Sequence, residues 1–213
     1  MEIDPKVITR IVLVRHGHVE GIAPERFRGR RDVPLSELGA RQAQATARRI
    51  AEQWTPVVTY SSPLQRCVQT AQAIGIACRT PVETLDDLND LHYGDWEWRT
   101  HAAASAESPE LYGRWTTTPQ LMQFPNGESL VDLAARVARA LWLILERHRQ
   151  QTVAVVGHSA GNRALLLQLL EQPLSAYWRL EQDPCSVSEI LITDRGPAVK
   201  CMNGTYHLRG LER

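Results

Sequence analysis

The stretch Val12-Leu13-Val14-Arg15-His16-Gly17 constrains the fold more than any other part of the sequence. The run of β-branched and aliphatic residues that ends at Val14 predicts a buried strand. Arg15 and His16 follow at its carboxyl end, which is where open α/β sheets place their chemistry. Gly17 has no side chain, so a backbone segment or a ligand can approach the histidine closely. We therefore expect His16 to be a nucleophile at the edge of a sheet.

Strands and helices alternate along most of the chain. The predicted strands cover about residues 10–15, 56–60, 81–84, 152–157, 187–193 and 198–202, and the predicted helices about 36–53, 63–74, 128–149 and 160–170. Ser36 and Ser62 are expected N-caps, with Pro63 at the first helical position. The last two strands are expected to form a hairpin. The alternation predicts an α/β fold, a three-layer sandwich with a mainly parallel sheet and helices on both faces.

The segment at about 86–125 interrupts this pattern. It is rich in aromatic residues, among them Trp96, Trp98 and Trp115, and it has no long amphipathic repeat. Aromatic residues at such density more often form a packed core than stack on ligands. We therefore expect residues 1–213 to form a single domain with an inserted lobe at 86–125.

Composition excludes several classes of partner. The chain has 24 Lys and Arg and 24 Asp and Glu among 213 residues, so it has no net attraction to nucleic acid or to a membrane surface. Its four cysteines lack zinc or disulfide spacing, which favours reduced thiols and a cytoplasmic location. No histidine spacing indicates a metal site, and no cofactor is expected. Neither a signal peptide nor a membrane-spanning stretch is expected. The sequence carries no signal for an oligomeric state.

Three predicted strands have a residue that can carry positive charge at or shortly after their carboxyl ends. These ends supply Arg15 with His16, Arg66 after Ser62, and His158 with Ser159. The carboxyl ends of a parallel sheet converge on one crevice. Two arginines and two histidines there would bind a dianion, since guanidinium groups pair well with phosphate oxygens. Helix N-termini after Ser62 and Ser159 would add N–H donors.

These groups suit phosphoryl transfer. A neutral imidazole can attack phosphorus and form a phosphohistidine that water later hydrolyses. The leaving oxygen needs a proton, and the stretch from 88 to 97 offers Asp90, Asp95 and Glu97 as acids. The expected partner is therefore a small phosphorylated metabolite.

A rival motif occurs in the same region. Gly157-His158-Ser159-Ala160-Gly161 fits the G-x-S-x-G nucleophile elbow of serine esterases, and Asp194 and His207 follow in the required order. This alternative leaves the blocks around His16, Arg66 and Asp90 unexplained, and the tail after Ser159 is short. A third alternative is a non-catalytic phospholigand binder, which the intact set of histidines and arginines disfavours.

In six ordered blocks the sequence resembles the histidine phosphatase superfamily, in its phosphoglycerate-mutase-like branch. The blocks are VRHG at 14–17, GRRDVPLSELGARQA at 29–43, YSSPLQRCVQTA at 60–71, LHYGDWE at 91–97, NGES at 126–129 and VVGHSAGNR at 155–163. The resemblance implies that His16 is the phosphorylated nucleophile. It further implies that Arg15, Arg66 and His158 bind the phosphoryl group, and that Asp90 is the acid.

The sequence departs from the family pattern at several positions. Asp90 stands where most relatives have glutamate, and Glu97 and Glu83 are alternative acids. Val19 and Ile22 replace a threonine and an asparagine, which suggests a remodelled pocket mouth, and Trp98 replaces a glycine and adds bulk near the lobe. The arginine-rich stretch 26–31 is either a solvated loop or a compensating substrate contact. Arg28, Trp96 and Ser159 are further candidates for substrate binding.

The resemblance implies a metal-independent phosphomonoester hydrolase that works through a phosphohistidine. Mutases of the superfamily are typically longer through the lobe, so phosphatase is favoured over mutase-type phosphoryl transfer. Phosphatases of α-ribazole phosphate and of sugar phosphates are both compatible, and nothing in the sequence chooses between them.

Overall fold

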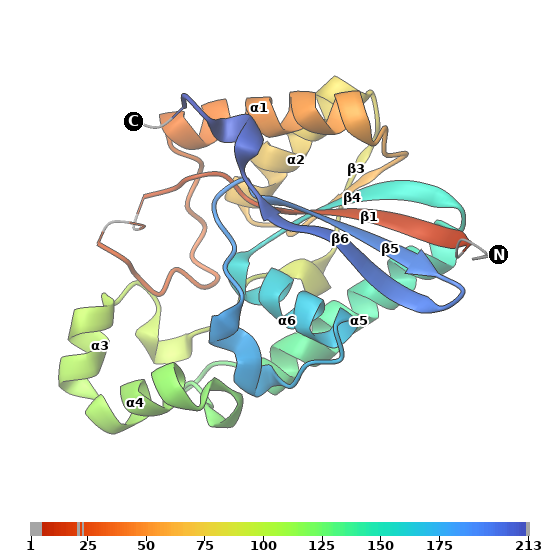
Figure 1. Cartoon of the computed structure of the whole chain (residues 1–213). Helices are drawn as coiled ribbons and strands as arrows, with labels where there is room; N and C mark the ends of the chain where they lie inside the picture. Colours follow the sequence, from red (N-terminus) through yellow and green to blue (C-terminus); the bar gives the residue numbers. More distant parts are fainter. Residues whose placement is uncertain (1–5, 21, 23, 212–213) are drawn as a thin grey trace.

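The structure is a computed structural model that describes residues 6–20, 22 and 24–211. Within these residues the sheet has six strands in the order β3-β2-β4-β1-β5-β6 (Figure 1). The strands are β1 (Val7–Arg15), β2 (Thr59–Ser61), β3 (Val82–Thr84), β4 (Gln151–Gly157), β5 (Val187–Thr193) and β6 (Gly196–Gly204). The first four are parallel to one another, and β5 and β6 form an antiparallel hairpin at one edge. The predicted mainly parallel α/β sheet and its terminal hairpin are confirmed.

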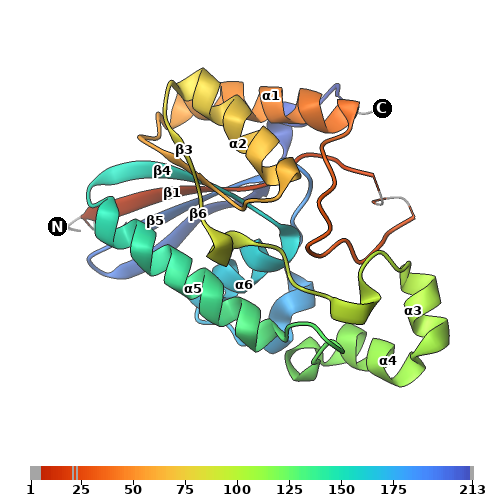
Figure 2. The ribbon, with the colours of Figure 1, turned by 180° about the vertical axis from the view of Figure 1, so that it is seen from behind.

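Helices cover both faces of the sheet. The α-helices are α1 (Glu37–Gln53), α2 (Gln65–Cys78), α3 (His101–Glu107), α4 (Pro109–Thr117), α5 (Leu130–Arg147) and α6 (Ser159–Leu169). Short 3₁₀ helices are η1 (Asp86–Leu88), η2 (Gly94–Trp96), η3 (Pro119–Leu121), η4 (Leu174–Arg179) and η5 (Tyr206–Leu208). Helices α1 and α2 lie on one face of the sheet, and α5 and α6 lie on the other (Figures 1 and 2). None of the helices in the described ranges has the length and apolarity that crossing a bilayer requires.

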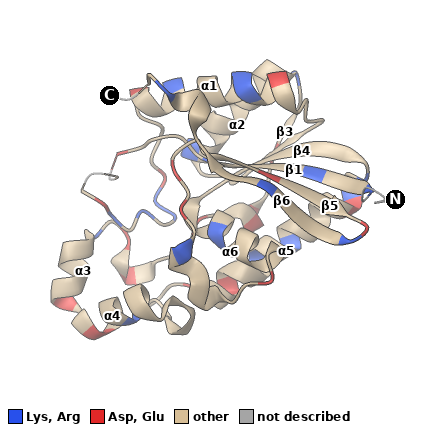
Figure 3. Ribbon diagram, in the orientation of Figure 1, with Lys and Arg blue, Asp and Glu red and all other residues tan. Residues whose placement is uncertain are grey.

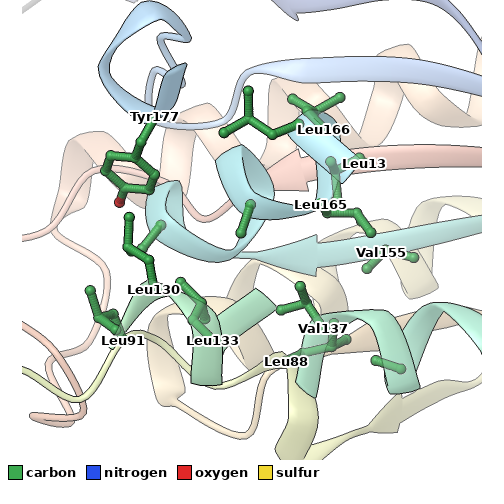
Figure 4. Close-up of a cluster of buried hydrophobic side chains, with 14 of the residues drawn as sticks. Leu13, Leu88, Leu91, Leu130, Leu133, Val137, Val155, Leu165, Leu166 and Tyr177 are labelled. Carbon is green, nitrogen blue, oxygen red and sulfur yellow. The ribbon is translucent and has the colours of Figure 1, made fainter. Parts of the chain in front are cut away.

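The alternation of side chains along β1 explains the two layers of core. Val12 and Val14 pack with the apolar residues of α1 and α2, whereas Ile11 and Leu13 pack with those of α5 and α6. Figure 4 shows side chains of the second cluster, with Leu13 of β1 beside Leu165 and Leu166 of α6. Because both faces of the strand are covered, residues 11–14 of β1 form a continuous apolar run.

One predicted helix start is confirmed and another is wrong. Ser36 is the N-cap of α1, and its hydroxyl accepts a hydrogen bond from the Gly39 amide at 3.1 Å. Helix α2 begins at Gln65 with Leu64 as its N-cap, so neither Ser62 nor Pro63 holds the predicted place. The Ser62 hydroxyl is instead 2.8 Å from His158 Nε2.

Residues 86–125, which we call the 86–125 segment, are mostly helical and project to one side of the sheet (Figure 1). Their aromatic side chains form the core of this part together with Phe27 from the loop before α1. Trp96 and Trp115 are among the largest fully buried side chains of the described chain, at 2% and 1% exposure. The expectation that these aromatics pack together is therefore confirmed.

The strand register brings the predicted site residues together. Arg15 pairs with Gly157 across β1 and β4, and Ser61 pairs with Val156 across β2 and β4. The three strands consequently end at one level of the sheet, directly before the segments that carry His16, Arg66 and His158.

Candidate active site

His16 follows the last residue of β1 and is almost completely buried, at 1% exposure. Its amide donates to the Gly157 carbonyl at 3.0 Å, which ties it to β4. Its Nδ1 lies 2.8 Å from the Gly17 carbonyl oxygen. A carbonyl can only accept, so Nδ1 carries the hydrogen and Nε2 keeps its lone pair. Burial and then the Arg66 charge hold the pKa of His16 well below its usual value, so the ring is neutral.

Two glycines let the loop after His16 cross the start of α1. A Cβ on Gly17 would lie 2.6 Å from the Gly39 carbonyl oxygen, and a Cβ on Gly39 would lie 2.0 Å from the His18 carbonyl oxygen. Backbone therefore packs directly on backbone at this crossing. The Gly17 amide also donates to the Thr70 hydroxyl of α2 at 3.2 Å.

His158 lies beside His16, with the ring centroids 5.2 Å apart. Arg66 Nε donates to His158 Nδ1 at 3.3 Å, and since a guanidinium cannot accept, Nε2 carries the hydrogen and donates to Ser62. Burial and the Arg66 charge lower the pKa of His158 well below its usual value. The Cys67 thiol packs 3.4 Å from Nε2, and burial raises the pKa of that thiol, so it stays protonated.

Arg66 is fully buried and joins the predicted acid to the histidine pair. Its Nη2 donates to Asp90 Oδ2 at 3.1 Å and to the Gly29 carbonyl at 2.7 Å, and its Nη1 donates to the Arg31 carbonyl at 2.8 Å. Asp90 Oδ2 is also 3.5 Å from His158 Nδ1. The Leu91 amide fixes Asp90 Oδ1 at 2.9 Å. Arg66 therefore orients the carboxylate and the imidazole.

A cavity of about 130 Å³ opens at this end of the sheet. Of the predicted residues it is lined by Arg15, His16, Arg28, Asp90 and Ser159. Burial and then the charges of Arg28 and Arg163 lower the pKa of Arg15 to about 10, which still leaves it protonated at neutral pH. Arg15 Nη1 donates to the Gln182 carbonyl. The cavity thus unites a neutral imidazole, guanidinium groups and the carboxyl groups of Glu25 and Asp90.

Several lining residues were missed by the sequence reasoning. They are Glu25, Phe27, Tyr93, His101, Trp115, Ala160, Arg163, Tyr177 and Trp178. Arg163 could have been predicted from the sequence, because it lies four residues after Ser159 on α6 and therefore on the same face of that helix. Tyr177 and Trp178 lie on the short helix η4, which has no periodic pattern of apolar residues in the sequence.

Trp96 does not reach the cavity. It packs against Phe27 and Phe124 at centroid distances of 5.2 and 5.5 Å, so the prediction that it binds substrate is wrong. The alternative acids also lie elsewhere. Glu83 is exposed on β3, 3.5 Å from Arg147, and Glu97 accepts from the Arg30 amide at 3.0 Å.

The arginines of the stretch 26–31 divide into different roles. Arg26 and Arg28 both line the cavity. Arg26 and Arg31 place their guanidinium groups over the Trp98 ring, 5.4 and 4.6 Å from its centroid. Trp98 itself has φ of 69°, a left-handed conformation that glycine adopts at no steric cost and other residues rarely adopt. The Trp98 ring, at the position where the family pattern has glycine, thus packs against two arginines of the stretch 26–31.

The other two departures lie away from the cavity lining. Val19 is fully buried and forms an isolated bridge with Leu35. Ile22 is half-buried, and its neighbours 21 and 23 lie outside the described residues. A remodelled pocket mouth at these positions stays a prediction.

The groups of the rival esterase motif are not assembled around Ser159. Asp194 accepts from the Lys6 amide, at the start of β1 and thus at the opposite end of the sheet. His207 Nε2 lies 2.9 Å from the Thr46 hydroxyl of α1. Across the residues the structure describes, no group of three or more His, Cys, Asp or Glu side chains could hold a metal ion.

Comparisons with known proteins agree with this geometry. The family model described as histidine phosphatase superfamily (branch 1) matches residues 11–205. The chain belongs to the histidine phosphatase superfamily. Phosphoserine phosphatase 1 of Hydrogenobacter thermophilus is similar, with 33% identity over 201 residues that cover 94% of this chain and 95% of the relative.

Further relatives carry other phosphatase names. The adenosylcobalamin/alpha-ribazole phosphatase of Escherichia coli is 27% identical, over 91% of this chain and 95% of its own length. The solved structure of Bacillus stearothermophilus YhfR superposes with a TM-score of 0.89 at 26% identity, covering 94% of this chain and 100% of that chain. Several mycobacterial relatives are longer, and this chain spans 55% of their length at 34% identity. Family and relatives support a phosphomonoesterase, as the sequence predicted.

Proposed function

We propose that the protein hydrolyses small phosphomonoesters through a phosphohistidine at His16, without a metal ion. The observation that carries the proposal is the state of His16, which lines the cavity as a neutral ring with its Nε2 lone pair retained. Neutral imidazole is a competent nucleophile toward phosphorus. Arg15 lines the same cavity, where its guanidinium can stabilise the charge of the transferring group. His158 lies beside His16, and its contact with that group stays a prediction.

The reaction divides into two displacements. In the first, His16 Nε2 bonds to phosphorus, the ester P–O bond breaks, and Asp90 gives its proton to the departing alkoxide. In the second, water attacks the phosphohistidine and gives a proton to Asp90, the P–N bond breaks, and phosphate leaves. Arg66 acts as the positioning residue for this acid, because it donates to Asp90 Oδ2 and to His158 Nδ1. Direct contact of Arg66 with the phosphoryl group stays a prediction.

The test is a phosphate-release assay on a panel of metabolite phosphates, including phosphoserine and α-ribazole phosphate. We expect turnover that EDTA leaves unchanged and that vanadate inhibits as a mimic of five-coordinate phosphorus. Rapid quenching with a ³²P-labelled substrate should trap an acid-labile, base-stable label on His16. Loss of activity in EDTA that added divalent ions restore would overturn the metal-independent mechanism. Labelling of Ser159 by a fluorophosphonate would favour the esterase instead.

A further inference from the structure

Positive charge is in excess around the cavity. Its lining, in the described part of the chain, holds four arginines and two carboxylates, namely Arg15, Arg26, Arg28, Arg163, Glu25 and Asp90. Arg66 adds a further guanidinium directly behind Asp90. A phosphoryl dianion neutralises only part of this excess. Burying like charges together costs free energy unless anions pair with them, so the arrangement suits a substrate with more than one anionic group.

Arg163 is held in a fixed position on the wall of the cavity. Its Nε donates to the Leu180 carbonyl at 2.6 Å, and its guanidinium carbon lies 5.2 Å from the ring centroids of both Tyr177 and Trp178. A guanidinium that is already stacked and anchored loses little conformational freedom when it binds an anion. Arg163 is therefore preorganised for a second carboxylate or phosphate.

Arg28 reaches the same cavity from a different part of the chain. It lies on the loop before α1, whereas Arg163 lies on α6, and Figure 3 shows Lys and Arg positions in blue on both segments. Both side chains line the cavity together with Arg15 and Tyr93, so they surround one space. Arg26 is less suited to this role, because its Nη1 donates to the Trp98 carbonyl at 2.8 Å.

We propose that Arg28 and Arg163 bind a second anionic group, so that the preferred substrates are small phosphomonoesters that also carry a carboxylate or a second phosphate. The inference rests on the proposed hydrolysis at His16 and names the substrate class of that site. Arg15 serves the reacting phosphoryl group, and the aromatic side chains around the cavity limit the size of the group that joins the two anions.

Two matched pairs of substrates test this. The first compares 3-phosphoglycerate with glycerol 3-phosphate, which differ in one carboxylate. The second compares fructose 1,6-bisphosphate with fructose 6-phosphate, which differ in one phosphate. We expect kcat/KM for the doubly anionic member to be higher by about tenfold or more in one pair, which also identifies the anion. Equal kcat/KM within both pairs would overturn the inference and leave the proposed hydrolysis intact, whereas no turnover of any phosphomonoester would overturn both.

Variants then assign the preference to residues. In Arg28→Gln and in Arg163→Gln we expect the ratio of kcat/KM within the discriminating pair to fall about tenfold, and Arg163→Lys should restore part of it. Arg179→Gln is the matched control, because Arg179 is exposed on η4 and does not line the cavity. An unchanged ratio in both glutamine variants, with circular dichroism showing a folded protein, would contradict the assignment.

Discussion

The inner end of the cavity and its outer wall are built in different ways. His16 and His158 directly follow two paired strands, and the bonds of the sheet fix their backbone. The outer wall comes from the loop before α1, from the 86–125 segment and from η4, where stacked rings and guanidinium groups replace strand pairing. The sheet thus holds the proposed reacting groups in position, and under the proposed function the less regular elements would determine which metabolite fits beside them.

The largest effect should come from the inner end. We expect His16→Ala to lower kcat by about 10⁴-fold or more, because loss of the nucleophile removes the covalent route. Steady-state kinetics and far-UV circular dichroism would measure this together. His92→Ala is the matched control, since His92 is half-buried, pairs with Glu97 and lies outside the cavity lining. Activity of His16→Ala within tenfold of the unmodified protein would place the nucleophile elsewhere.

Asp90→Asn should depend on the leaving group. An amide cannot give a proton to an alkoxide, so hydrolysis of alkyl phosphates should slow by about 10²–10⁴-fold. Hydrolysis of p-nitrophenyl phosphate should slow far less, because p-nitrophenolate leaves without protonation. Glu97→Gln provides the control, since that carboxylate lies outside the cavity. Equal slowing of both substrates by Asp90→Asn would remove Asp90 from the acid role.

Trp115→Ala tests whether the outer wall is part of the folded core. Trp115 is 1% exposed and contacts Phe124 and Trp178. Its truncation should lower the free energy of unfolding by about 3–5 kcal/mol, because it removes a buried ring and leaves a cavity. Urea denaturation measures the loss. Leu121→Ala, at a residue that is 70% exposed in the same segment, should change it by about 0.5 kcal/mol at most. An equal decrease in the free energy of unfolding in both variants would show that the buried Trp115 ring contributes no more to stability than an exposed side chain.

The pH dependence of stability should report on the inner histidines. His16 and His158 are buried and neutral in the folded state, with pKa values well below 6.5, whereas unfolded histidines titrate near about 6.5. Below that pH the unfolded state binds more protons, so stability falls as the pH decreases, by about 1.4 kcal/mol per pH unit for each histidine. Urea denaturation between pH 7 and pH 5 measures the slope. His16→Ala should reduce the slope, and an unchanged slope would contradict the buried neutral state.

The smallest effect concerns Ser62. Its hydroxyl accepts from His158 Nε2, so Ser62→Ala should loosen the ring and lower kcat/KM about tenfold. Ser61→Ala is a close control, because the Ser61 hydroxyl is equally buried but donates to the Ser62 carbonyl at 2.7 Å. Ser62→Ala should also change the chemical shifts of the His158 ring in ¹⁵N NMR spectra. Equal kcat/KM values in the two variants would show that the Ser62 hydroxyl does not position the His158 ring.

The site residues that could be predicted from the sequence are those at the ends of the parallel strands. Parallel strands are short apolar runs, and the residue after each run must lie at the shared edge, so the positions of His16 and His158 could be inferred from sequence. Ser62 was misplaced for a related reason. Its residue type favours a helix cap, but a buried histidine nitrogen competes for the same hydroxyl.

The outer wall was harder to predict. Trp96 and Trp115 are both buried aromatics of the 86–125 segment, yet Trp115 lines the cavity and Trp96 does not. Nothing local to either residue distinguishes them, because the difference depends on which side of one packed cluster meets η4. Tyr177 reaches the cavity through a 3₁₀ helix, and so short an element leaves no periodic pattern.

The backbone crossing at Gly17 and Gly39 gives the enzyme an unusual mechanical property. Where side chains separate two segments, small movements of one are absorbed by rotamer changes in between. Here no side chain intervenes, so a displacement of the first turn of α1 should also move the peptide next to His16, the proposed nucleophile. Directed evolution toward new substrates should therefore tolerate change in the outer wall and accept almost none at the amino-terminal end of α1.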